Sequence, residues 1–386
     1  MAEKPPYFRL SFFYLSYFAA LGAFVPYWSV YLKHNHFDSI AIGQLMGLFM
    51  FSKLLAPLIW GWITDHSGSR LKWIRIAAFL TIFGLLPVLY QSGYWWMAVA
   101  MLLFGFFWNA SLPQFEALTL NYLGSYTSRY SWIRLWGSIG FIAMVAGLPF
   151  VFKYQGVNSL PGVLLLLFIV TWLATFVISE KQQIHVPAFS SGKIITVIRH
   201  PMVIALFVAC ILQTASHGTY YTFFSIYLEE LGYSRVFTGW MWALGVVAEV
   251  VLFLFIYKLA DHFKTYQLFQ FALFLTCLRW VLLATLADHL NILLVSQILH
   301  AASYGLFHIS AIQLIHDWFP GRMQGRGQAL YAGLSFGLGG ALGSIISGYL
   351  WQYSGAAMSF LIMAVMAGLA WLAAILFIRK SELWKV

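Results

Sequence analysis

Charged residues are scarce in this sequence. They make up 9% of the 386 residues, against about 25% in a typical soluble domain. Hydrophobic residues make up 61%, and they form more apolar runs than one soluble core can bury. These two features exclude a soluble globular protein. They predict an all-α polytopic membrane protein.

Cysteines are few, and motifs of metal or nucleotide sites are missing. The two cysteines, Cys210 and Cys277, lie in apolar runs without metal-ligand spacing, so we expect no disulfide framework and no metal site. The glycines between 333 and 343 are not followed by G-K-[ST], which argues against a phosphate loop and an ATP-driven pump. We also expect no cleavable signal peptide, because the first apolar run is too long for one.

Twelve apolar segments are long enough to cross a bilayer, since about 20 helical residues span its hydrocarbon core. Their expected bounds are 9–32, 40–62, 73–91, 95–121, 132–153, 159–178, 201–228, 236–257, 265–287, 290–316, 327–351 and 355–378. The least apolar stretch, 179–199, separates the sixth segment from the seventh. We therefore expect a six-helix half at 1–178, a central cytoplasmic loop at 179–199 and a second six-helix half at 200–386.

The distribution of Lys and Arg over the loops predicts the orientation of the chain. With both termini cytoplasmic, 17 of the 22 Lys and Arg residues lie on the cytoplasmic side. Only Lys33, Lys153 and Arg235 then lie outside. The basic residues fall between apolar segments and not on one face, which argues against a nucleic-acid interface.

The two halves repeat at a constant offset of 196 residues. This shift places Ser29–Leu32 (SVYL) on Ser225–Leu228 (SIYL), Asp65-His66 on Asp261-His262, Gly137 on Gly333 and Gly147 on Gly343. Two parallel six-helix halves are the arrangement of major facilitator transporters, whose substrate site lies near the midplane between the halves.

The loop after the second segment, GWITDHSGSRLK, resembles the G-x-x-x-D-[RK]-x-G-[RK]-[RK] signature of the major facilitator superfamily. The matching positions, which the resemblance implies to be a gating motif together with Asp261 of the second half, are Gly61, Asp65, Gly68 and Arg70. His66 and Ser69 depart from the signature. The alternative is a tight solvated turn.

Two further motifs resemble the phenylpropionate permease family, a neighbour of the lactose permease. They are RLWGSIGF at 134–141 and FPGRMQGRGQALYAGLSFGLGG at 319–340. The resemblance runs the length of the chain and implies proton-coupled uptake across a bacterial inner membrane, driven by a proton gradient without a cofactor. It does not identify the substrate.

Glu116 and Arg134 fall in apolar segments, where an ionised side chain costs roughly 2.5–3.5 kcal/mol on insertion scales and usually faces a wet cavity. Asn109 lies seven residues before Glu116 on the same helix face. The lactose permease has an acid in helix 4 and an arginine in helix 5, so the resemblance implies that Glu116 and Arg134 bind substrate, and its stacking aromatic corresponds to Phe141. The alternatives are an ion pair of Glu116 with Arg134 or Lys53, and an Arg134 that reaches the headgroups.

Glu249 and Arg279 fall near the middle of the eighth and ninth segments, where each needs a partner. The lactose permease also has an acid in helix 8 and an arginine in helix 9. The resemblance implies a proton-coupling role for both residues, with Glu116 as the competing proton carrier. A static pair between Glu249 and Arg279 is the alternative. Lys53 has no evident role.

Two polar stripes run along otherwise apolar segments. The stripe in the tenth segment consists of Gln297, His300, Tyr304 and His308, and the shorter stripe in the seventh consists of Gln213, His217 and Tyr220. We expect both to line the substrate cavity, with ordinary core packing as the alternative. The acid that follows the helix-10 histidine of the lactose permease is missing here, and histidine competes as proton carrier because it titrates near neutral pH.

These features predict a proton-coupled symporter with the major facilitator fold that imports a small aromatic carboxylate, such as 3-phenylpropionate, by alternating access. The alternatives are a sugar or nucleoside:proton symporter and, in another class, a membrane sensor that transports nothing. An integral membrane enzyme is disfavoured because no nucleophile–base or metal cluster is present. We expect a monomer, with substrate, proton and lipid bilayer as partners and no nucleic acid.

Overall fold

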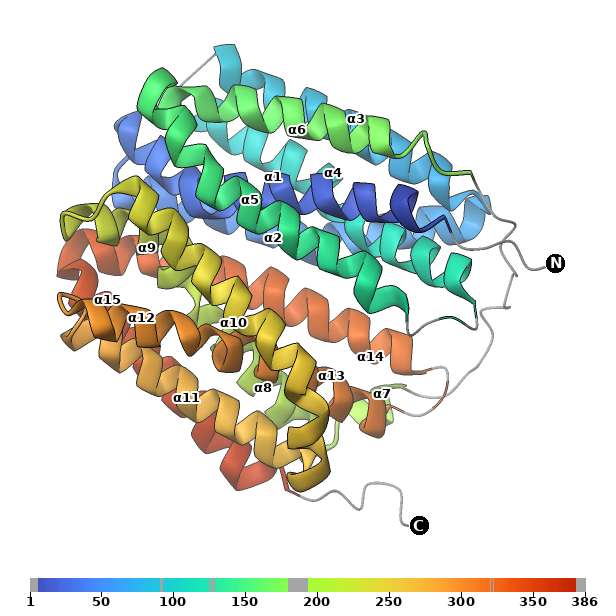
Figure 1. Ribbon diagram of the computed structural model, residues 1–386. Helices are drawn as coiled ribbons and strands as arrows, with labels where there is room; N and C mark the ends of the chain where they lie inside the picture. The colour runs from blue at the N-terminus through green and yellow to red at the C-terminus, as the bar shows by residue number, and fades with distance from the viewer. Residues whose placement is uncertain are drawn as a thin grey trace. The chain divides into compact units, whose positions relative to one another are not determined.

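A computed structural model describes residues 6–90, 93–124, 126, 129–179, 194–319, 321 and 323–379. Over these residues the structure consists of helices and connecting turns, without strands (Figure 1). Eleven helical segments are long and apolar enough to cross a membrane. The last, Met323–Phe377, has 55 residues and changes direction at Gly355, whose φ of 74° is left-handed, so it can cross twice. The expected all-α, polytopic fold is confirmed.

The helices of the first half follow the expected spans closely. They are α1 (Tyr7–His34), α2 (Ser39–Ser67), α3 (Arg70–Tyr90), α4 (Tyr94–Leu123), α5 (Tyr130–Gln155) and α6 (Leu160–Ala174), with the short turn η2 (Val157–Ser159) before α6. Most of the expected central loop, residues 180–193, lies outside the described residues.

The helices of the second half are more often interrupted. They are α7 (Ile194–Ile198), α8 (Pro201–Ser216), α9 (Gly218–Glu230), α10 (Arg235–His262), α11 (Thr265–Thr285), α12 (Leu290–Ile298), α13 (Phe307–Trp318), α14 (Met323–Ala332) and α15 (Gly340–Phe377). Two π-helical segments, η3 (Ala301–Leu306) and η4 (Gly333–Gly339), widen the tenth and eleventh spans. Such segments occur frequently at functional sites.

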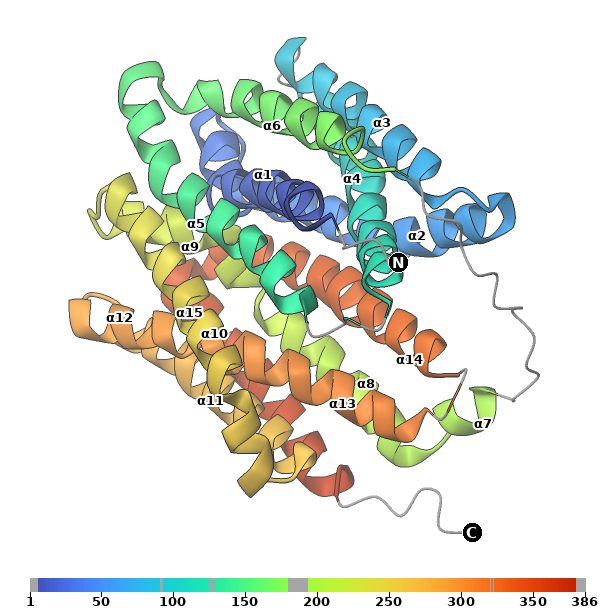
Figure 2. The ribbon, with the colours of Figure 1, turned by 45° about the vertical axis from the view of Figure 1, so that its right-hand side comes forward.

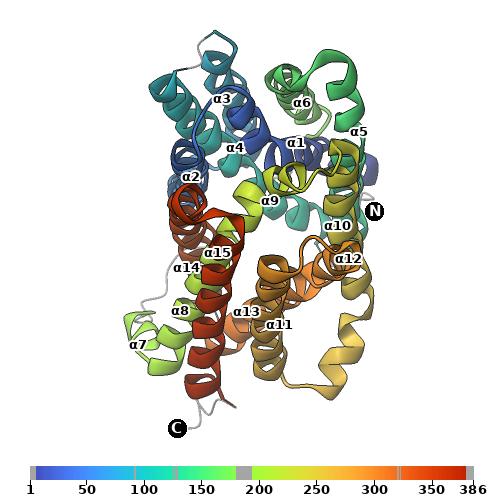
Figure 3. The same ribbon diagram turned by 90° about the vertical axis from the view of Figure 1, so that its left-hand side faces the viewer.

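The chain forms two compact units, one of Met1–Val186 with Leu228–Ala243 and one of Pro187–Tyr227 with Leu244–Val386. In the first unit, α1 packs against α5 and α6, and α4 packs against α2 and α3 (Figure 2). In the second unit, α15 packs against α8 and α11, and α11 also contacts η3 and α13 (Figure 3).

Glycines allow backbone-to-backbone contact at helix crossings in both units. A Cβ at Gly22 of α1 would lie 2.6 Å from the carbonyl oxygen of Phe141 in α5. A Cβ at Gly218 of α9 would overlap the backbone of Gly343 in α15. Gly22 and Gly218 are separated by the 196 residues of the sequence repeat, so related positions make the close contact in both halves.

The close crossing of α1 and α5 is tested by Gly140→Ala. A Cβ at Gly140 would overlap the carbonyl oxygen of Leu15, and overpacking of this kind costs about 1–3 kcal/mol. Gly147→Ala in the same helix is the matched control, because a Cβ there meets no atom within 4 Å. We expect thermal unfolding in detergent to show a lower midpoint for Gly140→Ala and an unchanged or higher midpoint for Gly147→Ala. Equal midpoints for the two variants would contradict this crossing.

Candidate functional site

Three basic side chains that the sequence places inside spans, Lys53, Arg134 and Arg279, lie in α2, α5 and α11. Each lies over an aromatic ring, with distances to the ring centre of 5.4 Å for Lys53 and Phe49, 3.7 Å for Arg134 and Phe18, and 4.2 Å for Arg279 and Tyr220. Within the part of the chain that the structure describes, none of the three forms an ion pair with a carboxylate. The direct contacts of these cations are therefore with ring faces, and Arg134 is also an electrostatic neighbour of Glu116.

Arg279 is completely buried. Its Nη1 donates to Nδ1 of His300 at 3.1 Å and to Oγ of Ser303 at 2.9 Å. Its Nε and Nη2 are buried without a hydrogen-bond partner. A guanidinium keeps its charge inside a protein, and a buried charge normally requires an opposite charge. Within the described structure Arg279 therefore has no carboxylate counter-ion and two donors without a partner in hydrogen-bond geometry, and its electrostatic neighbours are Tyr220 and Tyr221.

The contact with Arg279 determines the protonation state of His300. A guanidinium only donates hydrogen bonds, so Nδ1 of His300 accepts, and the imidazole is neutral with its proton on Nε2. His217 has the opposite arrangement, because its Nδ1 lies 2.8 Å from the carbonyl oxygen of Gln213, which only accepts. Its Nε2 is buried without a partner.

Two adjacent residues of α8 form hydrogen bonds to the two π-helical segments. The side-chain amide of Gln213 donates to the carbonyl oxygen of Ser303 in η3 at 2.9 Å and to Oγ1 of Thr276 in α11 at 2.7 Å. The hydroxyl of Thr214 lies 2.7 Å from the carbonyl oxygen of Ser335 in η4. The first pair of bonds ties η3 to α11, the helix that carries the buried guanidinium.

The expected polar stripe of the tenth span forms a stack of rings. The ring of Tyr304 lies between those of His300 and His308, at 5.6 Å and 6.0 Å, and the rings are nearly parallel. Nδ1 of His308 lies 2.9 Å from the hydroxyl of Tyr331. Gln297, at the start of the stripe, accepts a hydrogen bond from the hydroxyl of Tyr220 in α9 at 2.8 Å.

Glu249 lies beside η3 and not beside Arg279. Its Cγ is 3.1 Å from the position of a Cβ on Gly305, and Gly245, one turn earlier in α10, packs against the ring of His300. Among the described residues no ion pair joins Glu249 to Arg279. The static pair of these two residues, which was the alternative interpretation of the sequence, is therefore not formed within the described part of the chain.

Glu116 and Arg134 likewise form no ion pair in the described structure. The carboxylate of Glu116 accepts a hydrogen bond from the hydroxyl of Tyr130 at 3.3 Å. The guanidinium of Arg134 lies over the ring of Phe18 in α1. The two residues thus lie at the same end of the first half but are held by different neighbours.

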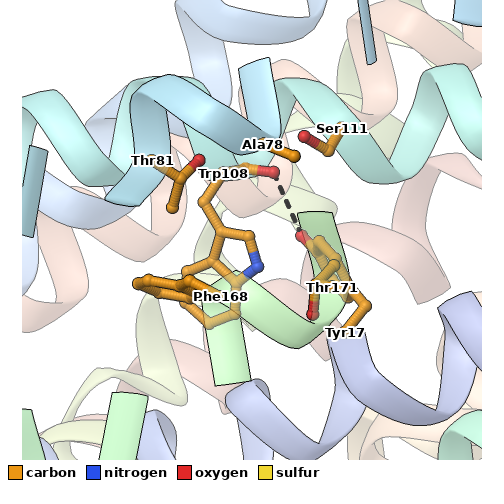
Figure 4. A pocket seen from close by; sticks show the side chains of 7 residues that line it. All are labelled: Tyr17, Ala78, Thr81, Trp108, Ser111, Phe168 and Thr171. Atoms are coloured by element: carbon orange, nitrogen blue, oxygen red, sulfur yellow. Dashed lines mark hydrogen bonds between the residues drawn. The ribbon is translucent and has the colours of Figure 1, made fainter. Parts of the chain in front are cut away.

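Asn109 and Phe141 are buried in helix contacts of the first half. The amide of Asn109 donates to Oγ of Ser52 in α2 at 2.9 Å. A small cavity in the same half contains neither of them (Figure 4). Its lining consists of Tyr17, Ala78, Thr81, Trp108, Ser111, Phe168 and Thr171.

The signature loop after α2 is a turn with a left-handed glycine. Gly68 follows the last residue of α2 with φ of 69°, a conformation that favours glycine, and Arg70 begins α3. A Cβ at Gly61 would meet only the amide of Gln114, at 3.7 Å. The side chain of Asp65 lies outside the described residues. Asp261, its counterpart in the repeat, is exposed near the end of α10.

Several residues of the site carried no signal of their own in the sequence. Ser303 bonds the guanidinium of Arg279, and the ring of Trp280 lies 4.6 Å from it. Tyr130 and Phe18 have comparable roles in the first half. Serine and aromatic residues are common in membrane helices, so only their neighbours in space distinguish these.

Comparisons with known proteins all point to transporters. The model described as "MFS_1 like family" matches residues 7–362. An Escherichia coli K12 protein named "Probable 3-phenylpropionic acid transporter" is 29% identical over 377 residues, covering 92% of this chain and 93% of that protein. The maltose permease of Geobacillus stearothermophilus is 25% identical and covers 88% of this chain and 87% of that protein. The crystal structure of the nucleoside transporter NupG has a TM-score of 0.85 at 16% identity, covering 97% and 99% of the two chains.

The two buried histidines should have opposite neutral tautomers. Isotope-labelled histidine, observed by nitrogen chemical shifts in detergent at about pH 8, should show His300 protonated on Nε2 and His217 on Nδ1. His300→Gln and His217→Gln assign the two signals. A His300 that is protonated on Nδ1 would contradict the hydrogen bond from Arg279.

Proposed function

The chain belongs to the MFS_1 like family of major facilitator transporters, and from this premise we propose that it imports a small aromatic carboxylate, such as 3-phenylpropionate, together with a proton. It is a multi-pass membrane transporter and not an enzyme. The proposal concerns its substrate, its coupling and its orientation.

The proposal of an anionic substrate rests on one observation. Lys53, Arg134 and Arg279 lie within spans, and the described structure gives none of them a carboxylate partner. A charge inside the membrane costs roughly 2.5–3.5 kcal/mol on insertion scales, and an opposite charge offsets part of that cost. A substrate carboxylate would supply the missing negative charge. The aromatic rings next to the three cations suit the apolar body of such a substrate.

The relatives support a small organic solute without identifying it. The Escherichia coli relative is named for 3-phenylpropionic acid, and two others are named for maltose and for nucleosides. A neutral sugar or nucleoside is the second candidate. This second candidate is favoured by the side chains of Gln297, Tyr304 and His308, which can form hydrogen bonds with hydroxyl and heterocyclic groups.

The proposed location is the inner membrane of a bacterium, with both termini cytoplasmic. The excess of Lys and Arg in the loops assigned to the cytoplasm supports this orientation. We further propose that the transporter acts as a monomer, needs no cofactor and uses the proton gradient as its energy source.

Uptake into proteoliposomes tests the proposal. With the outside more acidic than the inside, labelled 3-phenylpropionate should accumulate, and a proton-conducting uncoupler should abolish the accumulation. The neutral amide of the same acid is the matched control for charge, and it should neither accumulate nor compete. Accumulation of uridine or maltose, with no uptake of any carboxylate, would instead support the second candidate.

A further inference from the structure

Arg279 differs from the other two membrane cations in having donors that are both buried and unused. Its Nε and Nη2 have no partner, while Nη1 is fully occupied by His300 and Ser303. Nε–H and Nη2–H point in parallel from one side of a guanidinium and match the two oxygens of a carboxylate. No nitrogen of Lys53 or Arg134 is buried without a partner. The fork formed by Nε–H and Nη2–H of Arg279 therefore has the donor geometry that binds a carboxylate.

The surroundings of this fork suit an organic acid better than an inorganic anion. The ring of Tyr220 lies 4.2 Å from the guanidinium and that of Trp280 lies 4.6 Å from it. Both rings are buried, so they exclude water and strengthen the attraction between the guanidinium and a carboxylate. Their faces also provide apolar contacts for the body of the substrate.

His300 links this site to the proton. Its Nδ1 can accept from Arg279 only while the imidazole is neutral. A proton on Nδ1 removes that lone pair, breaks the bond to Nη1 and places a second positive charge beside the guanidinium. Both changes are unfavourable without an anion, and a bound carboxylate offsets both. A proton on His300 and a carboxylate on Arg279 therefore stabilise one another, and this coupling is reciprocal.

We propose that Arg279 and His300 form a proton-linked carboxylate site, in which Arg279 binds the carboxylate of the substrate and His300 takes up the coupled proton at Nδ1. The inference rests on the proposed import of a carboxylate and assigns that substrate to a particular residue. His300 acts as a positioning residue, since it releases or retains Nη1 of Arg279.

The other polar groups around His300 fit this assignment. From α9 it faces Tyr220 and Tyr221, and from its own helix it faces Tyr304. From the junction of α8 and α9, His217 is an electrostatic neighbour, and from α11 Arg279 is the bonded partner. From α10, Gly245 contacts the ring and Glu249 follows one turn later against η3. Glu249 is the one carboxylic acid among these named residues, and it contacts η3 at Gly305.

Proton uptake on binding tests the proposal. Titration calorimetry of 3-phenylpropionate into the purified protein, in two buffers with different ionisation enthalpies, counts the protons taken up per ligand. At about pH 6 to about pH 8 the ligand stays ionised, so any uptake belongs to the protein. The wild type should bind more tightly at the lower pH and take up about one proton or a large fraction of it.

Two substitutions of His300 should differ from one another in affinity. His300→Asn keeps a permanent acceptor near Nη1 of Arg279, so it should bind the acid more weakly than the wild type and take up no proton. His300→Leu removes the acceptor, so at about pH 8 it should bind more tightly than His300→Asn, again without proton uptake. Misfolding would weaken binding in either variant, so it cannot explain tighter binding by His300→Leu than by His300→Asn. His289→Asn, at an exposed histidine outside the site, should keep the proton uptake of the wild type.

Substitution of the arginines locates the carboxylate. Arg279→Lys should weaken binding by about tenfold or more, because an ammonium does not reproduce the fork, whereas Arg134→Lys should have a smaller effect. Proton uptake that persists in His300→Asn, or a larger loss in Arg134→Lys than in Arg279→Lys, would overturn this inference and leave carboxylate import standing. A wild type that binds no carboxylate at either pH would overturn the proposed function itself.

Discussion

The buried guanidinium of Arg279 is the constraint on which the second half of the molecule depends. Its charge is permanent, it is shielded from water, and the described residues provide it with no carboxylate. Its neighbours are arranged accordingly. His300 remains neutral in order to accept from it, and Ser303 adds a second acceptor. Gln213 ties the backbone of η3 to α11, so these acceptors remain in place.

The cations of the first half are also placed without a directly bonded carboxylate, although they are less deeply buried than Arg279. Lys53 and Arg134 lie over aromatic rings, and Glu116 is bonded to a tyrosine and not to a cation. Within the described residues the acids and bases of the spans thus form no ion pairs, although Arg134 is an electrostatic neighbour of Glu116. Separated charges remain available for a substrate or a proton, whereas paired charges would first have to be separated. The close crossings at Gly22 and Gly218 provide the rigid scaffold for this arrangement.

Much of the fold could be predicted from the sequence, because bilayer thickness sets the length of each apolar segment and the repeat shows two halves. The partners inside the site could not. A static pair between Glu249 and Arg279 was the alternative interpretation of the sequence, but Glu249 lies against Gly305 of η3. The π-helical segments accept hydrogen bonds from α8, and such bonds leave no periodic signal in the sequence. The sequence draws attention to Arg279, His300 and Gln213 because polar residues of their types are unusual in apolar spans, and their roles stay predictions.

The most direct test of this account is a structure determined with a bound aromatic carboxylate that carries a bromine atom on its ring, at about pH 6. The account predicts carboxylate oxygens within hydrogen-bond distance, roughly 2.7–2.9 Å, of Nε and Nη2 of Arg279, with the bond from Nη1 to His300 broken. A carboxylate bound at Arg134 or Lys53, with Arg279 still donating to His300, would contradict it.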